Sequence, residues 1–155
     1  MRRKDREITE KKQIEEFIAK EQIIRVGFYD EGDVYIVPVN YGYITNEGRY
    51  TFFFHVAKAG RKYELAKLKP LVGFEIDGKY ELTSGDIACE YSCKFQSIIG
   101  SGKLALIEDI SEKVIGLSAI MRQTTGRKNW DYGDDMLEEV AVFKLEVEKL
   151  SCKGK

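Results

Sequence analysis

The residues best suited to chemistry gather between His55 and Lys62, where basic side chains Lys58, Arg61 and Lys62 surround the expected start of a helix near Ala59. Basic side chains in a first helical turn face the positive end of the helix dipole, which costs about 0.3–1 kcal/mol each. Their presence is explained if an anion such as phosphate binds the free N–H groups and the cations. The alternative is a solvated basic turn whose long side chains extend into water.

His55 is the sole histidine of the chain, and we expect it where the apolar strand Tyr50–Phe54 ends. Its ordinary titration range suits hydrogen bonding or proton transfer near neutral pH, beside a bound phosphate or the ring edge of a cofactor. The alternative is a packed or capping side chain. Because no partner carboxylate is identifiable, the sequence does not predict a catalytic triad.

Two further segments combine apolar alternation with polar groups. Asn40 interrupts the apolar run Val37–Tyr43 with an amide that needs partners if it is buried, and such donors and acceptors suit the edge of a heteroaromatic ring. A bulged edge strand with locally satisfied Asn40 is the alternative. The run Glu90–Gly102 carries polar side chains on both faces, which indicates a barrel rim or a subunit interface. Its glycines Gly100 and Gly102 favour a kink or a close backbone approach.

The elements that position these segments follow from periodicity and turn residues. Helices are expected from an N-cap at Thr9 to Glu21, from Ala59 to Lys69, and after an N-cap at Ser111. Period-two alternation predicts strands at Ile24–Tyr29, Val34–Tyr41, Tyr50–Phe54, Leu71–Ile76, Tyr80–Leu82, Cys89–Ile107 and Val140–Val147, with a loop at Arg127–Asp135. Pro38 implies an edge strand or a bulge, because proline cannot donate to the ladder. The pattern predicts an α+β fold built on a mainly antiparallel β barrel with peripheral helices.

Composition limits the function classes. The 155 residues suit a single domain spanning 1–155, and a formal net charge of −1 gives no sign of a nucleic-acid or membrane partner. Three cysteines and one histidine without metal-type spacing predict no metal site and favour reduced thiols in the cytoplasm. Neither G-x-G-x-x-G nor G-x-x-x-x-G-K-[ST] is present, so the two commonest nucleotide cradles are excluded.

With these motifs in view, the chain resembles the pyridoxamine 5'-phosphate oxidase-like split-barrel flavoproteins, and among them the Nim-type 5-nitroimidazole resistance proteins. The resemblance covers nearly the whole chain. Its most specific string is Phe54-His55-Val56-Ala57-Lys58-Ala59-Gly60-Arg61-Lys62; the others are Met1-Arg2-Arg3-Lys4-Asp5-Arg6-Glu7, Val37-Pro38-Val39-Asn40-Tyr41-Gly42-Tyr43, Cys89-Glu90-Tyr91-Ser92 and Ser97-Ile98-Ile99-Gly100-Ser101-Gly102. The family often has a small hydroxyl residue where Val56 stands, a departure that loosens one phosphate contact.

The resemblance implies a homodimer with two flavin sites across the subunit interface. The cofactor would be FMN, with FAD as the alternative, and its phosphate would lie near Lys58, Arg61 and Lys62. The ring would lie along two strands, and His55 would line both the flavin and a substrate pocket as the candidate catalytic residue. The remaining candidate cofactor-binding residues are Val37, Pro38, Val39, Asn40, Tyr43, Ser97 and Ile98.

The function implied first is an FMN-dependent oxidoreductase that reduces a small aromatic or nitro compound such as a 5-nitroimidazole. A flavin supplies the hydride chemistry, while the protein tunes and shields it. A flavin carrier or sensor without turnover is an alternative from another class. Pyridoxamine phosphate oxidase-like chemistry or haem binding is a further alternative, although one histidine and no second ligand disfavour haem. Fold alone does not decide among these functions.

Overall fold

An eight-stranded antiparallel sheet forms the body of the protein, with strand order β3-β2-β6-β7-β8-β5-β4 and β1 paired with β8. The computed structural model describes residues 3–155. The strands are β1 (Glu7–Ile8), β2 (Ile23–Asp30), β3 (Asp33–Asn40), β4 (Gly42–Asn46), β5 (Arg49–Ala57), β6 (Leu71–Thr83), β7 (Ser92–Leu106) and β8 (Val140–Gly154). The helices are α1 (Lys11–Lys20), α2 (Arg61–Leu68), α3 (Ile110–Thr125) and α4 (Asp134–Glu139).

The sheet curls until β3 contacts β5, although these two strands are not hydrogen-bonded neighbours. This unpaired seam makes the barrel a split one, and it confirms the predicted α+β, mainly antiparallel split barrel. The predicted edge position of Pro38 is also confirmed, because β3 ends the strand order and Pro38 lies opposite Arg25 of β2. A proline there removes no hydrogen bond from the ladder.

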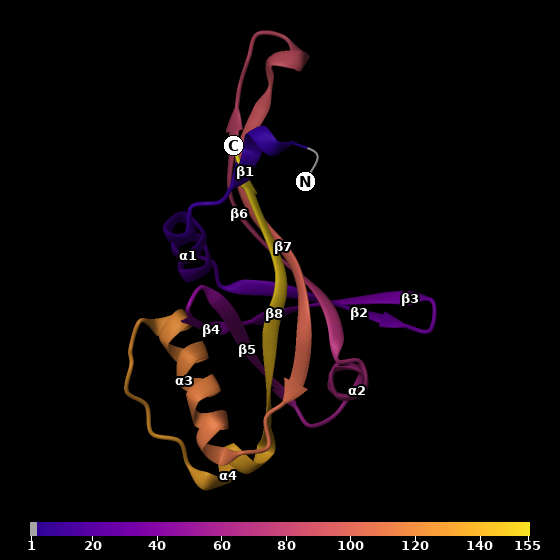
Figure 1. Ribbon diagram of the computed structural model, residues 1–155, viewed down its shortest axis with the longest axis vertical. Coiled ribbons are helices and arrows are strands. Elements are labelled where there is room, and N and C mark those ends of the chain that lie inside the picture. Colours follow the sequence, from indigo (N-terminus) through magenta and orange to yellow (C-terminus); the bar gives the residue numbers. More distant parts are fainter. Residues whose placement is uncertain (1–2) are drawn as a thin grey trace.

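Two apolar clusters hold the layers together. The larger fills the barrel, where α1 contributes the predicted face Ile14, Phe17 and Ile18. The smaller lies between the sheet and α3, which runs beside β4 and β5 (Figure 1). None of the helices within residues 3–155 is both long and apolar enough to span a membrane.

Two predicted helix caps are wrong by one or two residues. The N-cap of α1 is Glu10, whose carboxylate accepts from the N–H of Lys12, and Thr9 lies one residue before it. The N-cap of α3 is Asp109, whose Oδ1 accepts from the Glu112 N–H at 2.8 Å. In both places a carboxylate reaches the free N–H groups of the first turn, a role that oxygen-bearing side chains share.

Several predicted strand and helix boundaries differ from those in the structure, because strand pairing continues beyond the residues that show an alternating sequence pattern. β5 runs to Ala57, so His55 lies within a strand and not at its end, and α2 begins at Arg61. The segments expected at 71–76 and 80–82 form one strand, β6, while β7 begins only at Ser92 after a 3-10 turn at Ala88–Glu90. β8 continues to Gly154, the short strands β1 and β4 were not predicted, and α4 begins inside the expected 127–135 loop.

The close backbone approach expected at the β7 glycines is present. A Cβ atom on Gly100 would overlap the carbonyl oxygen of Lys149, and one on Gly102 would overlap that of Glu146. The β7–β8 register shifts between Ser101 and Gly102, so these glycines let the two longest strands bend together. Above this bend, β6 and β7 continue as a hairpin, the β6–β7 arm (residues 79–95), which rises beyond the rest of the sheet beside β1 (Figure 1).

Candidate functional site

The segment between β5 and α2 forms a basic corner, defined by His55, Lys58, Arg61 and Lys62. Gly60 is the N-cap of α2, with φ 91°, a left-handed conformation that favours glycine. No side chain caps this helix, so the first N–H groups of α2 are open to a ligand. Open amides beside cationic side chains form a site for an anion.

Two of the corner's cations are held by neighbouring elements. The Arg61 guanidinium pairs with Asp30 at 2.9 Å and lies over the Tyr35 ring at 4.5 Å from its centroid, which fixes it to the β2–β3 hairpin. Lys58 Nζ donates to the backbone carbonyl of Glu138 in α4. A partly exposed ion pair such as Arg61–Asp30 contributes about 0.2–1 kcal/mol, so an incoming phosphate can compete with it.

His55 lies on β5 opposite Val142 of β8 and presents an exposed edge. Partial burial, and then the positive charge of Lys62, lower the pKa of His55 from its ordinary value of 6.5. The imidazole is therefore neutral at neutral pH, with one ring nitrogen able to donate a hydrogen bond and the other able to accept one.

The candidate residues of β3 divide between its two faces. The side chains of Val37 and Val39 are buried in the barrel core, while those of Pro38 and Asn40 point outward. Asn40 Nδ2 donates to the carbonyl of Gln22 at 3.2 Å, so this amide is satisfied locally. Only the backbone of the two valines is available to a ligand, because their side chains pack inside.

Tyr43 lies on β4, opposite Phe52 of β5, and packs partly against the barrel core. Its carbonyl accepts from Arg122 at 2.9 Å, and burial raises the pKa of its phenol. On β7, Ile98 is fully buried in the barrel core, whereas Ser97 points to the opposite face and pairs with Asp77 of β6. Ile98 therefore offers a ligand its backbone alone.

One chain does not bring all the candidate residues together. His55 pairs with Val142 and Ser97 pairs with Lys153, which are 11 residues apart along β8. At about 3.3 Å per residue, that spacing places the two candidates roughly 35 Å apart. A single small ligand cannot reach both within one subunit.

An outer face that the sequence reasoning missed covers β3, β2, β6 and β7. Its exposed apolar side chains are Tyr29, Val34, Ile36, Leu71 and Ile99. The register pairs Gly27 with Gly73 at its centre, where a shallow hollow of about 320 Å³ opens between Arg25, Ile36 and Glu75. In β3, apolar residues occupy both the inward-facing and the outward-facing positions. This pattern was the sequence signal that both faces of the strand are covered.

Within residues 3–155, no group of three or more His, Cys, Asp or Glu side chains is placed to hold a metal ion.

The sequence pattern of the family described as pyridoxamine 5'-phosphate oxidase matches residues 10–154. The chain belongs to this family. No curated protein sequence matches it significantly.

Solved structures share the same split barrel. A candidate 5-nitroimidazole antibiotic resistance protein from Bacteroides thetaiotaomicron is 31% identical, with 96% of this chain and 86% of that chain covered and a TM-score of 0.82. An FAD- and haem-binding protein from Mycobacterium smegmatis has 12% identity, 97% and 73% coverage and a TM-score of 0.83. A flavocytochrome from Azotobacter vinelandii has 18% identity, 100% and 72% coverage and a TM-score of 0.81. The last two likenesses concern the fold.

The environment of His55 predicts a measurable titration. As the sole histidine, it gives a single imidazole Cε1–H resonance. We expect the pH titration of its chemical shift to have a midpoint below 6.5. Because the unfolded chain then binds this proton more tightly than the native state does, the free energy of unfolding decreases as the pH falls from 6.5, the ordinary pKa of histidine, through the lower pKa of His55 in the folded state. Lys62→Gln should raise the midpoint part of the way, since burial is the larger cause, whereas Lys69→Gln should leave it unchanged. A midpoint of 6.5 or above would contradict this assignment.

Proposed function

We propose that the protein is a homodimeric, FMN-dependent oxidoreductase that reduces a small aromatic or nitro compound. The observation that carries this proposal is the basic corner, where the uncapped start of α2 and the cations Arg61 and Lys62 lie beside His55, a histidine whose pKa is lowered. The chain's membership of the pyridoxamine 5'-phosphate oxidase family supports the proposal.

The corner has the chemistry that a flavin phosphate requires. A phosphate monoester offers several acceptor oxygens, and the open N–H groups of α2, the Lys62 ammonium and the Arg61 guanidinium supply the matching donors. Asp30, the present partner of Arg61, repels an anion, so we expect Arg61 to share or exchange this partner on binding. Lys62 also links the phosphate to His55, whose pKa its charge lowers.

Two copies of the chain complete the site in this proposal. Ser97 lies roughly 35 Å from His55 within one subunit, at about 3.3 Å per residue along β8. The apolar outer face that carries Ser97 is exposed in the isolated chain, and a patch of this kind is typical of a protein interface. In this proposal the face packs on its own symmetry mate so that its Ser97 end meets the opposite end of the partner's face, since in a two-fold interface residue i contacts residue j and j contacts i; Ser97 of one subunit then approaches the basic corner of the other.

When bound, the flavin supplies the hydride or electron transfer to the acceptor. The chain's own residues orient and shield it: Arg61, Lys62 and the α2 amides hold the phosphate end, and the edge strand β3 offers backbone donors and acceptors. A neutral His55 presents a ring nitrogen that accepts or donates a proton near neutral pH. The similarity to the candidate 5-nitroimidazole resistance protein of B. thetaiotaomicron supports a nitro acceptor.

Turnover distinguishes the proposed reductase from a flavin carrier. The purified protein should show flavin absorption bands, and after anaerobic chemical reduction a 5-nitroimidazole should reoxidise it faster than free FMN is reoxidised. Tight flavin without acceptor-dependent reoxidation would favour the carrier instead. A colourless protein that binds neither FMN nor FAD would refute the proposal as a whole.

The phosphate site is tested by removing its cations. Arg61→Ala combined with Lys62→Ala should weaken FMN binding by about tenfold or more, since each lost charge-assisted hydrogen bond contributes about 1.5–3 kcal/mol. Lys67→Ala combined with Lys69→Ala removes two cations from the other end of the same helix and should leave the affinity unchanged. Fluorescence titration of FMN measures both variants. Equal affinities in the two double variants would place the phosphate elsewhere.

The outer face is tested by adding a charge to its centre. Ile36 is 59% exposed, so Ile36→Asp should leave the subunit folded but desolvate a carboxylate in the dimer, which is strongly unfavourable. Sedimentation should show a dimer for the parent chain and a monomer with weakened flavin binding for this variant. Ile110→Asp, at a residue on α3 that is 62% exposed, is the matched control. A monomeric parent chain would contradict the shared site.

A further inference from the structure

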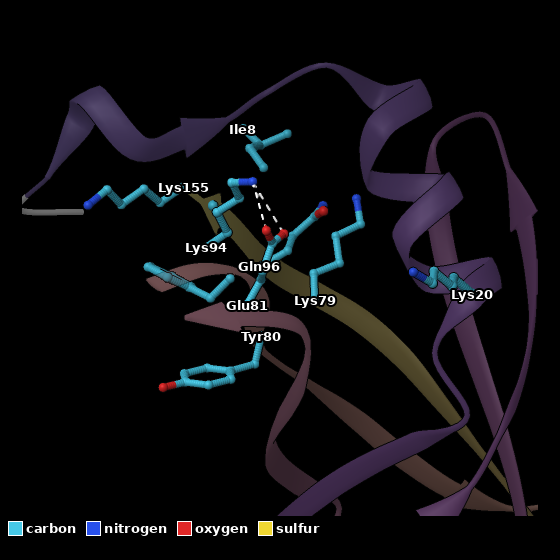
Figure 2. Close-up of a pocket in the computed structure, with 10 residues that line it drawn as sticks. Ile8, Lys20, Lys79, Tyr80, Glu81, Lys94, Gln96 and Lys155 are labelled. Atoms are coloured by element: carbon cyan, nitrogen blue, oxygen red, sulfur yellow. Dashed lines mark hydrogen bonds and ion pairs between the residues drawn. The ribbon is translucent and has the colours of Figure 1, made fainter. Parts of the chain in front are cut away.

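A separate hollow of about 750 Å³ lies at the base of the β6–β7 arm, bounded by β1, α1 and the end of β8 (Figure 2). We call it the arm pocket. It opens on the face of β7 opposite to the outer face. Lys20, Lys79, Lys94 and Lys155 line it against one acid, Glu81, so its lining carries a formal excess of positive charge. Small-molecule sites commonly have volumes of about 300–1,000 Å³.

The cations of the pocket differ in their partners. Lys94 pairs with Glu81 at 3.1 Å, and Lys155 donates to the Ser92 hydroxyl. The salt bridges of residues 3–155 include neither Lys20 nor Lys79. Lys79 Nζ lies over the Phe17 ring at 6.0 Å from its centroid, a contact that leaves its charge unneutralised, so both ammonium groups can pair with an anion.

Lys79 occupies its position at a conformational cost. Its φ is 56°, in the left-handed region, which a residue with a Cβ atom rarely adopts. The other non-glycine residues with positive φ in the described chain, Glu31 and Glu47, each precede a glycine in a tight hairpin turn. Lys79 instead lies in the register shift between Gly78 and Glu81, and a bulge of this kind redirects a side chain. Figure 2 shows Lys79 pointing into the arm pocket.

A buried amide provides the second, independent feature. Gln96 is only 5% exposed, and its Nε2 makes a weak contact with Cys152 Sγ at 3.7 Å. No donor to its Oε1 is recorded among residues 3–155, yet none of their side-chain polar atoms is both fully buried and unpaired. This oxygen is therefore reached from the pocket. In Figure 2 the amide ends between the Lys94–Glu81 ion pair and Lys79.

The Gln96 amide oxygen faces the pocket and needs a hydrogen-bond donor there, from water or from a ligand, because an unmade hydrogen bond of a largely buried amide is costly. A leucine would fill the same space without that cost. The polar end of Gln96 and the strained Lys79 thus point to the same ligand, one with a charged group and an uncharged polar edge.

We propose that the arm pocket binds a small organic anion, in which a phosphate or carboxylate contacts Lys20 and Lys79 and a heteroaromatic edge hydrogen-bonds to Gln96. Cationic groups above the Phe95 ring, Arg6 at 5.9 Å and Lys153 at 5.7 Å from its centroid, extend the positive rim. The arm pocket lies at the other end of β8 from the basic corner and opens on the face of β7 opposite to Ser97. It gives the protein a second ligand besides its proposed cofactor.

Two matched pairs of probes test this proposal on the protein after incubation with FMN. AMP is compared with adenosine, and nicotinate with nicotinamide, by calorimetry and by the shift of the Gln96 side-chain NH₂ resonances. We expect at least one anion to bind about tenfold more tightly than its neutral counterpart, with a salt-dependent affinity and with movement of the Gln96 signals. If both AMP and nicotinate fail to bind, or bind without moving these signals, the proposal is overturned. Inorganic phosphate that binds as tightly as AMP would reveal an ion site only, and would equally refute it.

Two substitutions localise the binding. Lys79→Gly suits the left-handed backbone, so it should keep or raise the Tm while weakening the anion severalfold. Lys128→Gly, in the exposed loop before α4, is the control and should leave binding unchanged. Gln96→Leu should weaken AMP but not inorganic phosphate, because it removes only the contact with the ring. Unchanged AMP affinity in both Lys79→Gly and Gln96→Leu would place the anion outside the arm pocket.

Discussion

The backbone pairing of β8 is the constraint on which the rest of the structure depends. One edge of β8 pairs with β7, and the other pairs with β5 along residues 140–146 and with β1 at Cys152 and Lys153. Its alternating side chains also serve both clusters: Phe143 and Leu145 pack in the barrel, and Val142 packs against α3. Because β8 joins both halves of the sheet, its register positions the basic corner at one end and the arm pocket at the other.

The basic corner contains cations at a position that is unfavourable for the helix that follows it. Cations in the first turn oppose the dipole of α2, and the fold does not cap this helix with a side chain. Instead it holds Lys58 against α4 and Arg61 against the β2–β3 hairpin. The structure thus keeps positive charge and open amides together at one corner of the molecule.

The sequence predicted the parts of the fold that depend on near neighbours. Alternation identified β2, β3 and β5, and Pro38 identified an edge strand. His55 was placed wrongly at a strand end, because β5 continues as far as Ala57 only through its pairing with Val140 of β8. The caps at Thr9 and Ser111 were wrong because an adjacent carboxylate, at Glu10 or Asp109, competes for the same N–H groups. No local signal decides between such candidates.

The same distinction separates the candidate sites. The basic corner was predictable because its cations are close in sequence, whereas the arm pocket combines Ile8, Lys20 and Gln96, which only the tertiary fold brings together. A glutamine within an alternating strand gives no sign that its amide oxygen faces a pocket. Likewise, the distance between His55 and Ser97 depends on the length of β8, which exceeds its predicted end at Val147.

The glycine pair at the centre of the outer face has a consequence for mutational tolerance. A Cβ atom on Gly27 or on Gly73 would meet no atom closer than 3.8 Å within the chain. Alanine at either position therefore leaves the isolated subunit without a clash. Any selection that keeps these residues small must therefore act through the molecule that covers the outer face. A screen for stability of the isolated subunit would tolerate larger residues at these two positions, whereas a screen for function would not.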